Sequence, residues 1–387
     1  MRIALVHDYL KEYGGAESVL EALSDIFPDA PIYTALYHPA SFGPHRSRLE
    51  KKWQGRIHPS FFQYLLFAHK IISPLRLLSP LAFNFMNFKN FDLIISSATG
   101  AYFPNAVNKQ SAKLICYCHT PPRYLYGLPT ARDLKKYPFF NALAQIANHF
   151  LRLLDFKYAQ NVDQFIANSS TTAARIQKFY RRNSIVINPP VEIFKIAKPA
   201  IFGAQSSEVP SEGREHRKMV GERFYLTGGR LARAKRYDIA IQACNQLKLP
   251  LKIFGRDFAG FESQLKSIAG LTVEFLGEVT QEQKADLFSQ AKAYLFCSDQ
   301  EDFGIVSVEA QGYGCPVVGY KSGGITETVV DNKTGVLFDE LTPASCATAI
   351  QKLQKLKIDP KDCQKNAVRF SRDQFVQKIK KFTSSLF

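Results

Sequence analysis

The sequence lacks any apolar run long enough to cross a membrane. No stretch of its 387 residues reaches the roughly 18 to 20 apolar residues that a spanning helix needs. It shows no secretory signal, because Met1 and Arg2 lead straight into a strand-like run followed by Asp8. It has neither internal repeats nor low-complexity tracts. We therefore expect a cytoplasmic protein, with peripheral attachment to the cytoplasmic face of a membrane left open.

Cysteine is also sparse and scattered. The seven cysteines form no second pair with the spacing of a zinc site, and an odd, dispersed set is typical of a reducing cytoplasm. Cys116 and Cys118 alternate with Tyr117 in an apolar run, so both side chains should face the same side of a strand. These two cysteines are predicted to be core residues.

Acidic residues are scarce in the first half of the chain. The formal net charge is +16, and residues 1–200 hold 24 Lys and Arg against 12 Asp and Glu, a net of +12. Seven of the eight histidines lie in the same half. The N-terminal half should therefore meet something anionic: a phospholipid surface, a pyrophosphate-linked acceptor or nucleic acid.

Short apolar runs alternate with helical patterns along the whole chain. This alternation predicts an α/β fold with parallel, doubly wound sheets. Strands are expected at 2–9, 31–37, 92–97, 114–119, 164–168 and 185–188, and again at 224–227, 251–254, 272–276, 293–297 and 316–320.

The chain is too long for one ordinary core, so two Rossmann-like domains facing a cleft are expected. We place the N-terminal domain at 1–200 and the C-terminal domain at 223–369. The polar stretch 201–222 is predicted to be a linker or surface insertion. A closing C-terminal helix, about 370–387, is assigned to the first domain.

The most informative segment is 301–318, in which Glu301 and Glu309 stand eight positions apart around Phe303-Gly304-Ile305. Gly304 permits a tight turn, and the helix that follows points unpaired N–H groups at a ligand. A phosphate suits that helix N-terminus, which carries about half a positive charge. Glu309 can accept two hydroxyl donors from a diol. The arrangement favours a phosphate-linked sugar.

Two glycine loops accompany this segment. Gly228 and Gly229 precede Arg230 and Lys235. The planar guanidinium of Arg230 and the compact ammonium of Lys235 together suit a diphosphate. Gly14 and Gly15 follow the first strand, but they do not form the G-x-G-x-x-G pattern of dinucleotide binding.

Polar residues also follow two strands of the first half. His119 ends the strand 114–119, and His7-Asp8 end the first strand. Strand ends in open α/β sheets face the ligand crevice. His119 is therefore a candidate site residue. His7 and Asp8 are weaker candidates for contact with an acceptor substrate, and their alternative role is to form a turn.

The segment 301–318 resembles the Glu-x7-Glu motif of glycosyltransferase family 4, and the loop 228–235 resembles its Gly-Arg-Leu-x3-Lys motif. The run 322–338 also resembles this family, whose members are retaining enzymes with the GT-B fold. The run 118–126 (CHTPPRYLY) resembles an O-antigen mannosyltransferase subgroup. The resemblance implies transfer of a hexose, mannose first, from a nucleotide-diphosphate sugar such as GDP-mannose in cell-surface polysaccharide synthesis. Its expected partners are the nucleotide sugar and a glycan or lipid-linked acceptor, with an anionic membrane surface as a further candidate and no nucleic acid.

The resemblance also implies residue roles. Its catalytic set would be His119, Glu301, Arg230 and Lys235; its donor-binding set would be Gly14, Gly15, Arg230, Lys235, Arg256, Phe303, Gly304, Ile305 and Glu309. No Asp-x-Asp pair of the metal-dependent type occurs, so neither metal nor cofactor is expected. Two departures are Ser307, where proline is common, and Arg256, where an acidic or small residue is common and which leaves the nucleotide in doubt.

Two alternatives remain open. A glycan phosphorylase on the same fold needs a pyridoxal phosphate or phosphate pocket that the sequence does not identify. A non-catalytic basic protein that binds membrane or nucleic acid would explain the charge of the first half but not the acidic pair of the second. The aromatic, basic-flanked segment 59–88, broken by Pro74 and Pro80, is predicted to be either ordinary core or a membrane-binding surface.

Overall fold

The computed structural model describes residues 1–130, 138–192, 223–258 and 260–386. The chain forms two compact units, Met1–Pro190 with Arg372–Phe387 and Val191–Ser371. The stretch predicted as a linker, 201–222, lies outside the described residues.

The first unit is built on one parallel sheet of seven strands in the order β3-β2-β1-β4-β5-β6-β7. The strands are β1 (Ile3–His7), β2 (Ile32–Thr34), β3 (Ile57–Pro59), β4 (Leu93–Ala98), β5 (Lys113–Cys118), β6 (Gln164–Ala167) and β7 (Ser184–Val186). Strands β1, β4 and β5 are buried on both faces, as near-continuous apolar runs in parallel sheets require.

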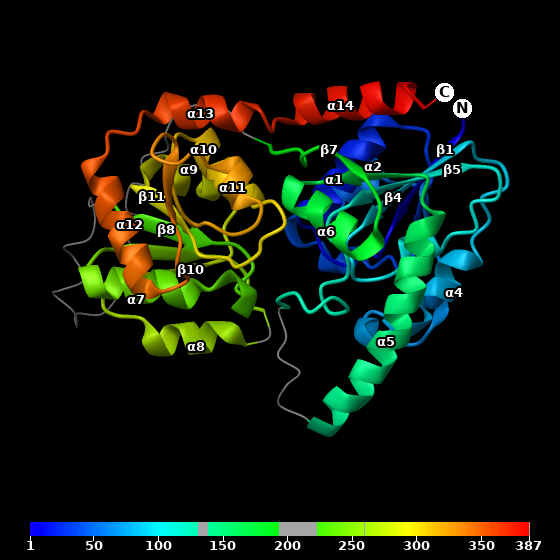
Figure 1. Cartoon of the computed structure of the whole chain (residues 1–387), viewed down its shortest axis with the longest axis horizontal. Coiled ribbons are helices and arrows are strands. Elements are labelled where there is room, and N and C mark those ends of the chain that lie inside the picture. Colours follow the sequence, from blue (N-terminus) through cyan, green and yellow to red (C-terminus); the bar gives the residue numbers. More distant parts are fainter. Residues whose placement is uncertain (131–137, 193–222, 259, 387) are drawn as a thin grey trace. The chain divides into compact units, whose positions relative to one another are not determined.

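Helices cover both faces of this sheet (Figure 1). They are α1 (Gly15–Ile26), α2 (Arg46–Lys52), α3 (Ile72–Leu75), α4 (Ser79–Asn84), α5 (Pro138–Asn161), α6 (Ser170–Tyr180) and α14 (Arg372–Ser384), with short 3-10 turns η1 (Pro39–Ser41), η2 (Gly43–His45), η3 (Phe61–Tyr64), η4 (Arg76–Leu78) and η5 (Pro104–Ala106). The C-terminal helix α14 returns to this unit, where Phe375 and Ile379 are buried in the same cluster as Leu5 and Ile95.

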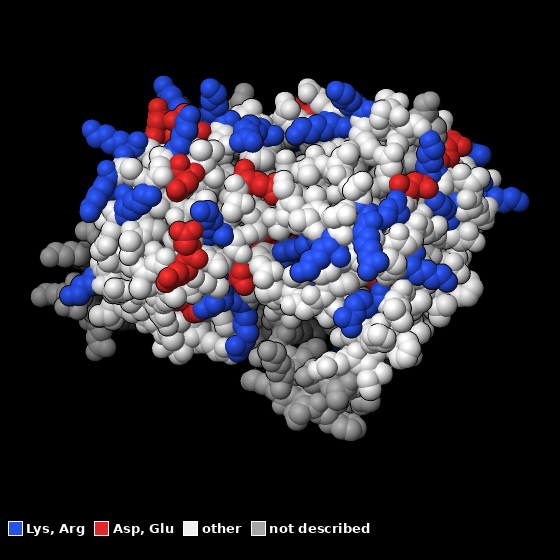
Figure 2. Space-filling view, in the orientation of Figure 1, with Lys and Arg blue, Asp and Glu red and all other residues white. Residues whose placement is uncertain are grey.

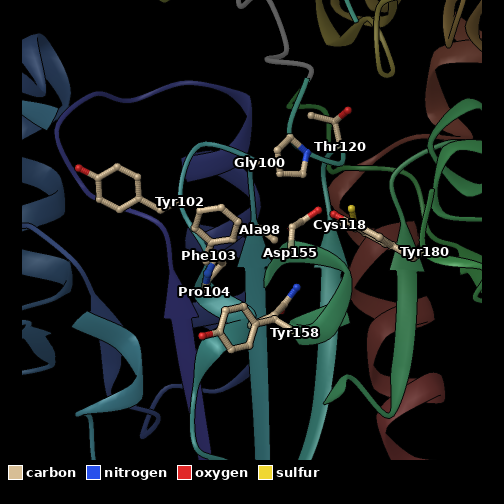
Figure 3. A pocket seen from close by; sticks show the side chains of 12 residues that line it. Ala98, Gly100, Tyr102, Phe103, Pro104, Cys118, Thr120, Asp155, Tyr158 and Tyr180 are labelled. Carbon is tan, nitrogen blue, oxygen red and sulfur yellow. The ribbon is translucent and has the colours of Figure 1, made fainter. Parts of the chain in front are cut away.

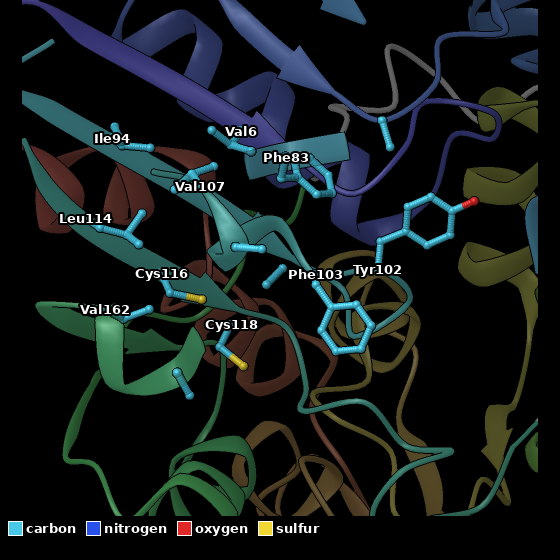
Figure 4. Close-up of a cluster of buried hydrophobic side chains, with 14 of the residues drawn as sticks. Val6, Phe83, Ile94, Tyr102, Phe103, Val107, Leu114, Cys116, Cys118 and Val162 are labelled. Atoms are coloured by element: carbon cyan, nitrogen blue, oxygen red, sulfur yellow. The ribbon is translucent and has the colours of Figure 1, made fainter. Parts of the chain in front are cut away.

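Alternate residues of each strand enter different clusters. Figure 4 shows Val6, Ile94, Leu114, Cys116 and Cys118 pointing into one core. The prediction that both cysteines are core residues is therefore confirmed, and all seven cysteines of the chain are buried free thiols.

The second unit repeats the architecture with six parallel strands in the order β10-β9-β8-β11-β12-β13. They are β8 (Tyr225–Gly228), β9 (Leu251–Phe254), β10 (Val273–Gly277), β11 (Ala293–Phe296), β12 (Val317–Tyr320) and β13 (Gly335–Phe338). Its helices are η8 (Arg233–Lys235), α7 (Tyr237–Leu247), α8 (Phe261–Ile268), α9 (Gln281–Gln290), α10 (Ile305–Gly312), α11 (Ile325–Thr328), α12 (Pro343–Lys355) and α13 (Pro360–Val368). The order is that of a Rossmann sheet.

The predicted fold class of two parallel, doubly wound α/β domains is thus confirmed. Strands β3 and β13 were not predicted. Among the described residues, no helix combines the length and apolarity needed to span a bilayer. Within the segment 59–88, Phe62, Phe83 and Phe88 are core residues, as one of the two alternatives predicts, whereas Tyr64 and Leu66 are strongly exposed.

Candidate active site

In the second unit, the segment after β11 forms a tight turn that starts helix α10. Gly304 is the N-cap of this helix and has φ 86°, a backbone conformation that favours glycine. Ser307 holds the turn, since its hydroxyl donates to the Gly304 carbonyl at 2.7 Å and lies 2.9 Å from the Thr328 hydroxyl. A proline at this position would lack that hydroxyl. The first N–H groups of α10 have no partner within the helix and can receive an anion.

One carboxylate oxygen of Glu301 accepts two hydrogen bonds. Lys235 Nζ lies 2.7 Å from Glu301 Oε2, and the Ser298 hydroxyl donates to the same oxygen at 2.7 Å. The backbone beside Glu301 is held by the next glycine loop, where the Gly324 N–H donates to the Glu301 carbonyl at 2.8 Å. A Cβ on Gly323 would clash with that carbonyl, so only glycine allows this approach. The structure therefore brings the predicted Glu301 and Lys235 together.

Glu309 lies on α10 and is paired with a cation that the sequence reasoning missed. Lys284, on α9, donates to Glu309 Oε1 at 2.8 Å, and both side chains are mostly buried. Lysine in a polar helix gives no sequence signal for such a contact, because the two residues meet only through the packing of α9 against α10. The pair orients the Glu309 carboxylate.

The loop after β8 carries Arg230. Its guanidinium lies 5.1 Å from the centre of the Phe258 ring, a cation–π distance. The Leu231 N–H donates to the Arg256 carbonyl at 2.8 Å, so the predicted donor-binding loops of Arg230 and Arg256 run side by side. A Cβ on Gly255 would clash with the Gly229 backbone, and a Cβ on Gly228 would clash with the Phe254 carbonyl, so the close approach of the two loops requires glycine in each. The exposed Arg256 side chain itself lies 3.8 Å from Glu278.

Phe303 and Ile305 flank the turn. The Phe303 side chain is only 2% exposed and packs edge-on against Phe370 at 5.3 Å between ring centres. It is therefore a core residue, and the backbone of this turn is what remains for a ligand. Ile305 is the first residue of α10 and is partly buried in the same cluster.

In the first unit, His7 and His119 share one serine. Ser97 Oγ lies 3.0 Å from His7 Nδ1 and 2.9 Å from His119 Nε2. The register of β1 and β4 sets this arrangement, because His7 is paired directly with Ser97. Ser97 has one proton, so it donates to one ring and accepts from the other, which couples the tautomers of the two imidazoles. Burial, and then the nearby His7, lowers the pKa of His119 to about 3, so its ring is neutral.

The chain of contacts continues to Glu17. His7 Nε2 is buried without a hydrogen-bond partner in the described part of the chain and lies 3.6 Å from Glu17 Oε1. The other Glu17 oxygen accepts the Gly14 N–H at 2.9 Å and so caps α1. Gly14 is extended and Gly15 opens the helix. These two predicted donor-binding glycines thus lie next to the histidine pair.

Asp8 is anchored through a single oxygen. Its Oδ2 accepts the backbone N–H groups of Ala101 and Tyr102 at 3.0 Å each, together with the Thr99 hydroxyl. Its Oδ1 is buried and has no hydrogen-bond partner among the described residues. A buried acceptor without a donor is costly, and a ligand hydroxyl would satisfy it.

A small pocket lies beside these strand ends (Figure 3). Its lining includes Gly100, Cys118, Thr120, Asp155 and Tyr180. Burial raises the pKa of Asp155 to about 7, and hydrogen bonds from the Tyr126 and Tyr180 hydroxyls offset this only in part. Sequence reasoning did not identify this acid, since a single aspartate in an apolar helix carries no motif.

The described residues contain no cluster of three or more His, Cys, Asp or Glu arranged to hold a metal ion. The site residues instead fall into two sets by unit. In the second unit, Lys235 contacts Glu301 just before α10, Glu309 lies on α10, and Arg230 lies in the loop after β8. In the first unit, His7, Asp8 and His119 lie at strand ends, where Ser97 links the two histidines.

Comparison with known proteins identifies both halves. Residues 13–193 match the family described as Glycosyltransferase Family 4, and residues 210–370 match Glycosyl transferases group 1. The chain carries the two domains of a glycosyltransferase. The acidic pair, the basic loop and the α10 turn all lie within the second glycosyltransferase domain, and His119 lies within the first.

Individual relatives are distant. The chain is 23% identical to alpha-1,3/1,6-mannosyltransferase ALG2 of Mus musculus over 411 aligned residues, covering 96% of this chain and 94% of that protein. It is 25% identical to D-inositol 3-phosphate glycosyltransferase of Corynebacterium urealyticum, of which it spans 56%. Among solved structures, Anabaena Alr3699/HepE in complex with UDP and glucose has a TM-score of 0.69 at 21% identity, with full coverage of both chains. This last likeness concerns the fold, and it agrees with the predicted GT-B class.

Proposed function

We propose that this glycosyltransferase transfers a hexose from a nucleotide-diphosphate sugar to a glycan or lipid-linked acceptor, with retention of the anomeric configuration, in cell-surface polysaccharide synthesis. The observation that carries the proposal is the α10 turn, around which two carboxylates are each fixed by a lysine. Mannose, carried by GDP, is the first candidate, and the similarity to a mannosyltransferase supports it. UDP-hexoses come second, supported by the UDP complex of a protein with the same fold.

In the proposed reaction, the bond between the sugar C1 and the diphosphate oxygen breaks while the acceptor hydroxyl oxygen bonds to C1 from the same face. The acceptor proton passes to an oxygen of the departing diphosphate. Negative charge therefore grows on that diphosphate. Arg230, Lys235 and the first N–H groups of α10 are assigned to stabilise it, because preorganised cations and N–H dipoles act most strongly on developing charge.

The remaining residues orient the reactants. Glu301 is assigned to hydroxyls of the transferred sugar and Glu309 to the ribose diol. In the first domain, His119 is assigned to the sugar, and His7 and Asp8 to the acceptor. The unpartnered buried Oδ1 of Asp8 supports this last role, since an acceptor hydroxyl would complete its hydrogen bonding. Ser97 and Glu17 would then act as positioning residues that hold the two histidines.

Calorimetry with GDP, UDP and ADP and their sugar conjugates tests the proposal. Glu309→Ala should weaken the preferred nucleotide at least about tenfold, because a hydrogen bond to a carboxylate is worth roughly 1.5 to 3 kcal/mol. Glu262→Ala is a matched control, because Glu262 forms a similar lysine pair at 2.7 Å, with Lys266, on the surface of α8. Equal affinity of the parent and Glu309→Ala for every nucleotide would contradict the assigned site.

A further inference from the structure

The first unit exposes large apolar side chains over two neighbouring segments. Residues 61–85 contribute Phe61, Tyr64, Leu65, Leu66, Phe67, Ile71, Leu77, Leu78, Leu81 and Phe85, and α5 contributes Ile146, Phe150, Leu153, Leu154 and Phe156. Helices α4 and α5 both pack against η5 and lie next to each other in Figure 1. We call these fifteen side chains the apolar surface.

The apolar surface is firmly attached to the core. Within residues 61–85, Phe62 and Phe83 are fully buried in the main cluster of the first unit, and Ala82 is 1% exposed. Between these anchors, Tyr64 and Leu66 are 86% and 85% exposed, and just after them Phe85 is 73% exposed. The projecting side chains are therefore held in place by folded neighbours. Leaving so many apolar groups in water is unusual for a soluble monomer and marks an interaction surface.

The charge around this surface has one sign. Residues 61–89 contain three basic residues, Lys70, Arg76 and Lys89, and no Asp or Glu. Lys70 is exposed on the first segment and Lys89 just after it, and Arg152 and Lys157 are exposed on α5. The single acidic residue of α5 is Asp155, which is buried. In Figure 2, the visible face of the first unit carries more Lys and Arg than Asp and Glu.

Helix α5 shows the pattern of a helix that lies on a bilayer. Ile146, Phe150 and Leu153 recur at intervals of four and three residues, which places them on one face, and Lys157 continues that face. An apolar stripe bordered by basic residues is typical of helices that bind at the interface of anionic membranes.

We infer that the apolar surface binds the surface of an anionic phospholipid bilayer. The aromatic and aliphatic side chains enter the headgroup region, and Lys70, Lys89, Arg152 and Lys157 contact lipid phosphates. The charges argue against a second copy of the chain, since a symmetric dimer through this surface would bring like cations together. This inference goes beyond the proposed reaction, because it concerns where the enzyme is held rather than what it transfers.

Vesicle co-sedimentation tests the inference. The full chain is mixed with vesicles of phosphatidylcholine alone or of phosphatidylcholine with phosphatidylglycerol. The parent should bind the anionic vesicles more tightly, with affinity that falls as salt rises. Tyr64→Ser/Leu66→Ser/Phe67→Ser should lower the partition coefficient at least about tenfold on both vesicle types, because it removes apolar groups that the bilayer would bury.

Leu271→Ser is the matched control, because Leu271 is 93% exposed but lies on the second unit; its partition coefficient should stay within about twofold of the parent. Lys70→Gln/Lys89→Gln should reduce binding to anionic vesicles and leave the residual binding to neutral vesicles unchanged. Melting temperatures and nucleotide affinity, measured on the same preparations, separate loss of membrane binding from misfolding or from failure of the proposed reaction.

Three results would overturn the inference. The first is a parent that stays in the supernatant with anionic vesicles. The second is a Leu271→Ser variant that loses as much binding as the triple serine variant. The third is a parent that light scattering shows to be a dimer and that the triple serine change converts to a monomer without altering vesicle binding, which would make the surface an interface between copies.

Discussion

The two units share one topology but differ in their surfaces. Each is a parallel sheet in the Rossmann order, with apolar strands buried on both faces. The first unit exposes fifteen large hydrophobic side chains over two adjacent segments, whereas the described residues of the second unit expose three, Leu271, Val330 and Val368. The fold therefore does not dictate this surface, and its concentration in one unit is the reason that the bilayer contact is proposed for that unit alone.

The candidate site residues differ in the same way. In the second unit, carboxylates meet lysines in partly exposed pairs, an arrangement suited to a charged ligand that enters from water. In the first unit, His7, Ser97 and His119 are buried, and His119 is neutral because burial lowers its pKa. This difference agrees with the proposed reaction, in which the second unit stabilises charge and the first orients neutral hydroxyls.

The largest expected effect tests the charge stabilisation that is proposed for the second unit. Arg230→Ala and Lys235→Ala should each lower kcat by about 10² to 10³, because a preorganised group that stabilises developing charge acts mainly in the transition state. The double variant should lose less than the product of the two, since both residues act on one diphosphate. Steady-state kinetics with saturating donor measures these effects.

Arg233→Ala is the control for that experiment. Arg233 lies in the same basic loop, but its guanidinium donates to Gln264 at 2.7 Å and contacts the Phe261 ring. The kcat of Arg233→Ala should therefore stay within about threefold of that of the parent. If Arg230→Ala behaves like Arg233→Ala in a folded protein, the basic loop is only a solvated surface and the donor site lies elsewhere.

The next effect concerns the buried acid of the first unit. Asp155 holds its proton up to about pH 7 in the folded protein, whereas an unfolded aspartate loses it near pH 3.8. The folded state thus binds more protons between these values, and stability must fall as pH rises through this window. The shift corresponds to at most about 4 kcal/mol.

Asp155→Asn removes this titration while keeping an acceptor for the Tyr126 hydroxyl. The melting temperature of the parent relative to the variant should fall as the pH rises from 3.8 to about 7, since the parent alone must ionise a buried group. Differential scanning calorimetry at several pH values provides the comparison. Parallel curves for the two proteins would mean that Asp155 ionises at its ordinary pKa.

The fold was predictable because apolar runs alternate regularly with helical patterns. The strand at 251–254 was predicted with its observed bounds. Strand β3 (Ile57–Pro59) was missed because an edge strand of three residues that ends in proline has no buried alternation to detect. Strand β13 was missed because four residues between polar stretches give too short a pattern to show a period.

The site was predictable only where residues form local motifs. Glu301, Gly304 and Glu309 belong to one turn and one helix, so their spacing alone placed them together. Lys284 and Ser97 carry no motif. Lys284 reaches Glu309 through helix packing, and Ser97 reaches His7 through the register of two strands that are 90 residues apart. Such partners depend on tertiary structure, which a single sequence does not encode in any short pattern.

A smaller effect tests whether the buried residues of the first unit orient the reactants. Ser97→Ala should lower kcat about tenfold with little change in donor KM, because it releases the His119 ring while leaving the donor contacts of the second unit intact. Ser97→Thr, which keeps the hydroxyl, should recover part of the activity. Kinetics with the donor varied at saturating acceptor separates kcat from KM.

Ser96→Ala controls for simple loss of a buried hydroxyl. Ser96 is the preceding residue of β4 and is equally buried, but its hydroxyl bonds to Asn105 instead of the histidines. It should lose stability to a similar degree and keep its kcat. If both serine variants lose activity in proportion to their loss of stability, Ser97 has a structural role only.

The smallest expected effect is that of removing metal ions, which should leave the rate of transfer unchanged. If Arg230, Lys235 and the N–H groups of α10 supply the positive charge that the departing diphosphate requires, a chelator should leave the rate of transfer unchanged within about twofold. The measurement is the initial rate in EDTA, with and without added Mn²⁺ or Mg²⁺. Because free diphosphate nucleotides bind these metals, product inhibition must be measured separately under each condition. Complete loss of transfer in EDTA, restored by either metal, would show that a metal ion completes the charge around the diphosphate, and the fixed cations of the second unit would then act beside that ion rather than in its place.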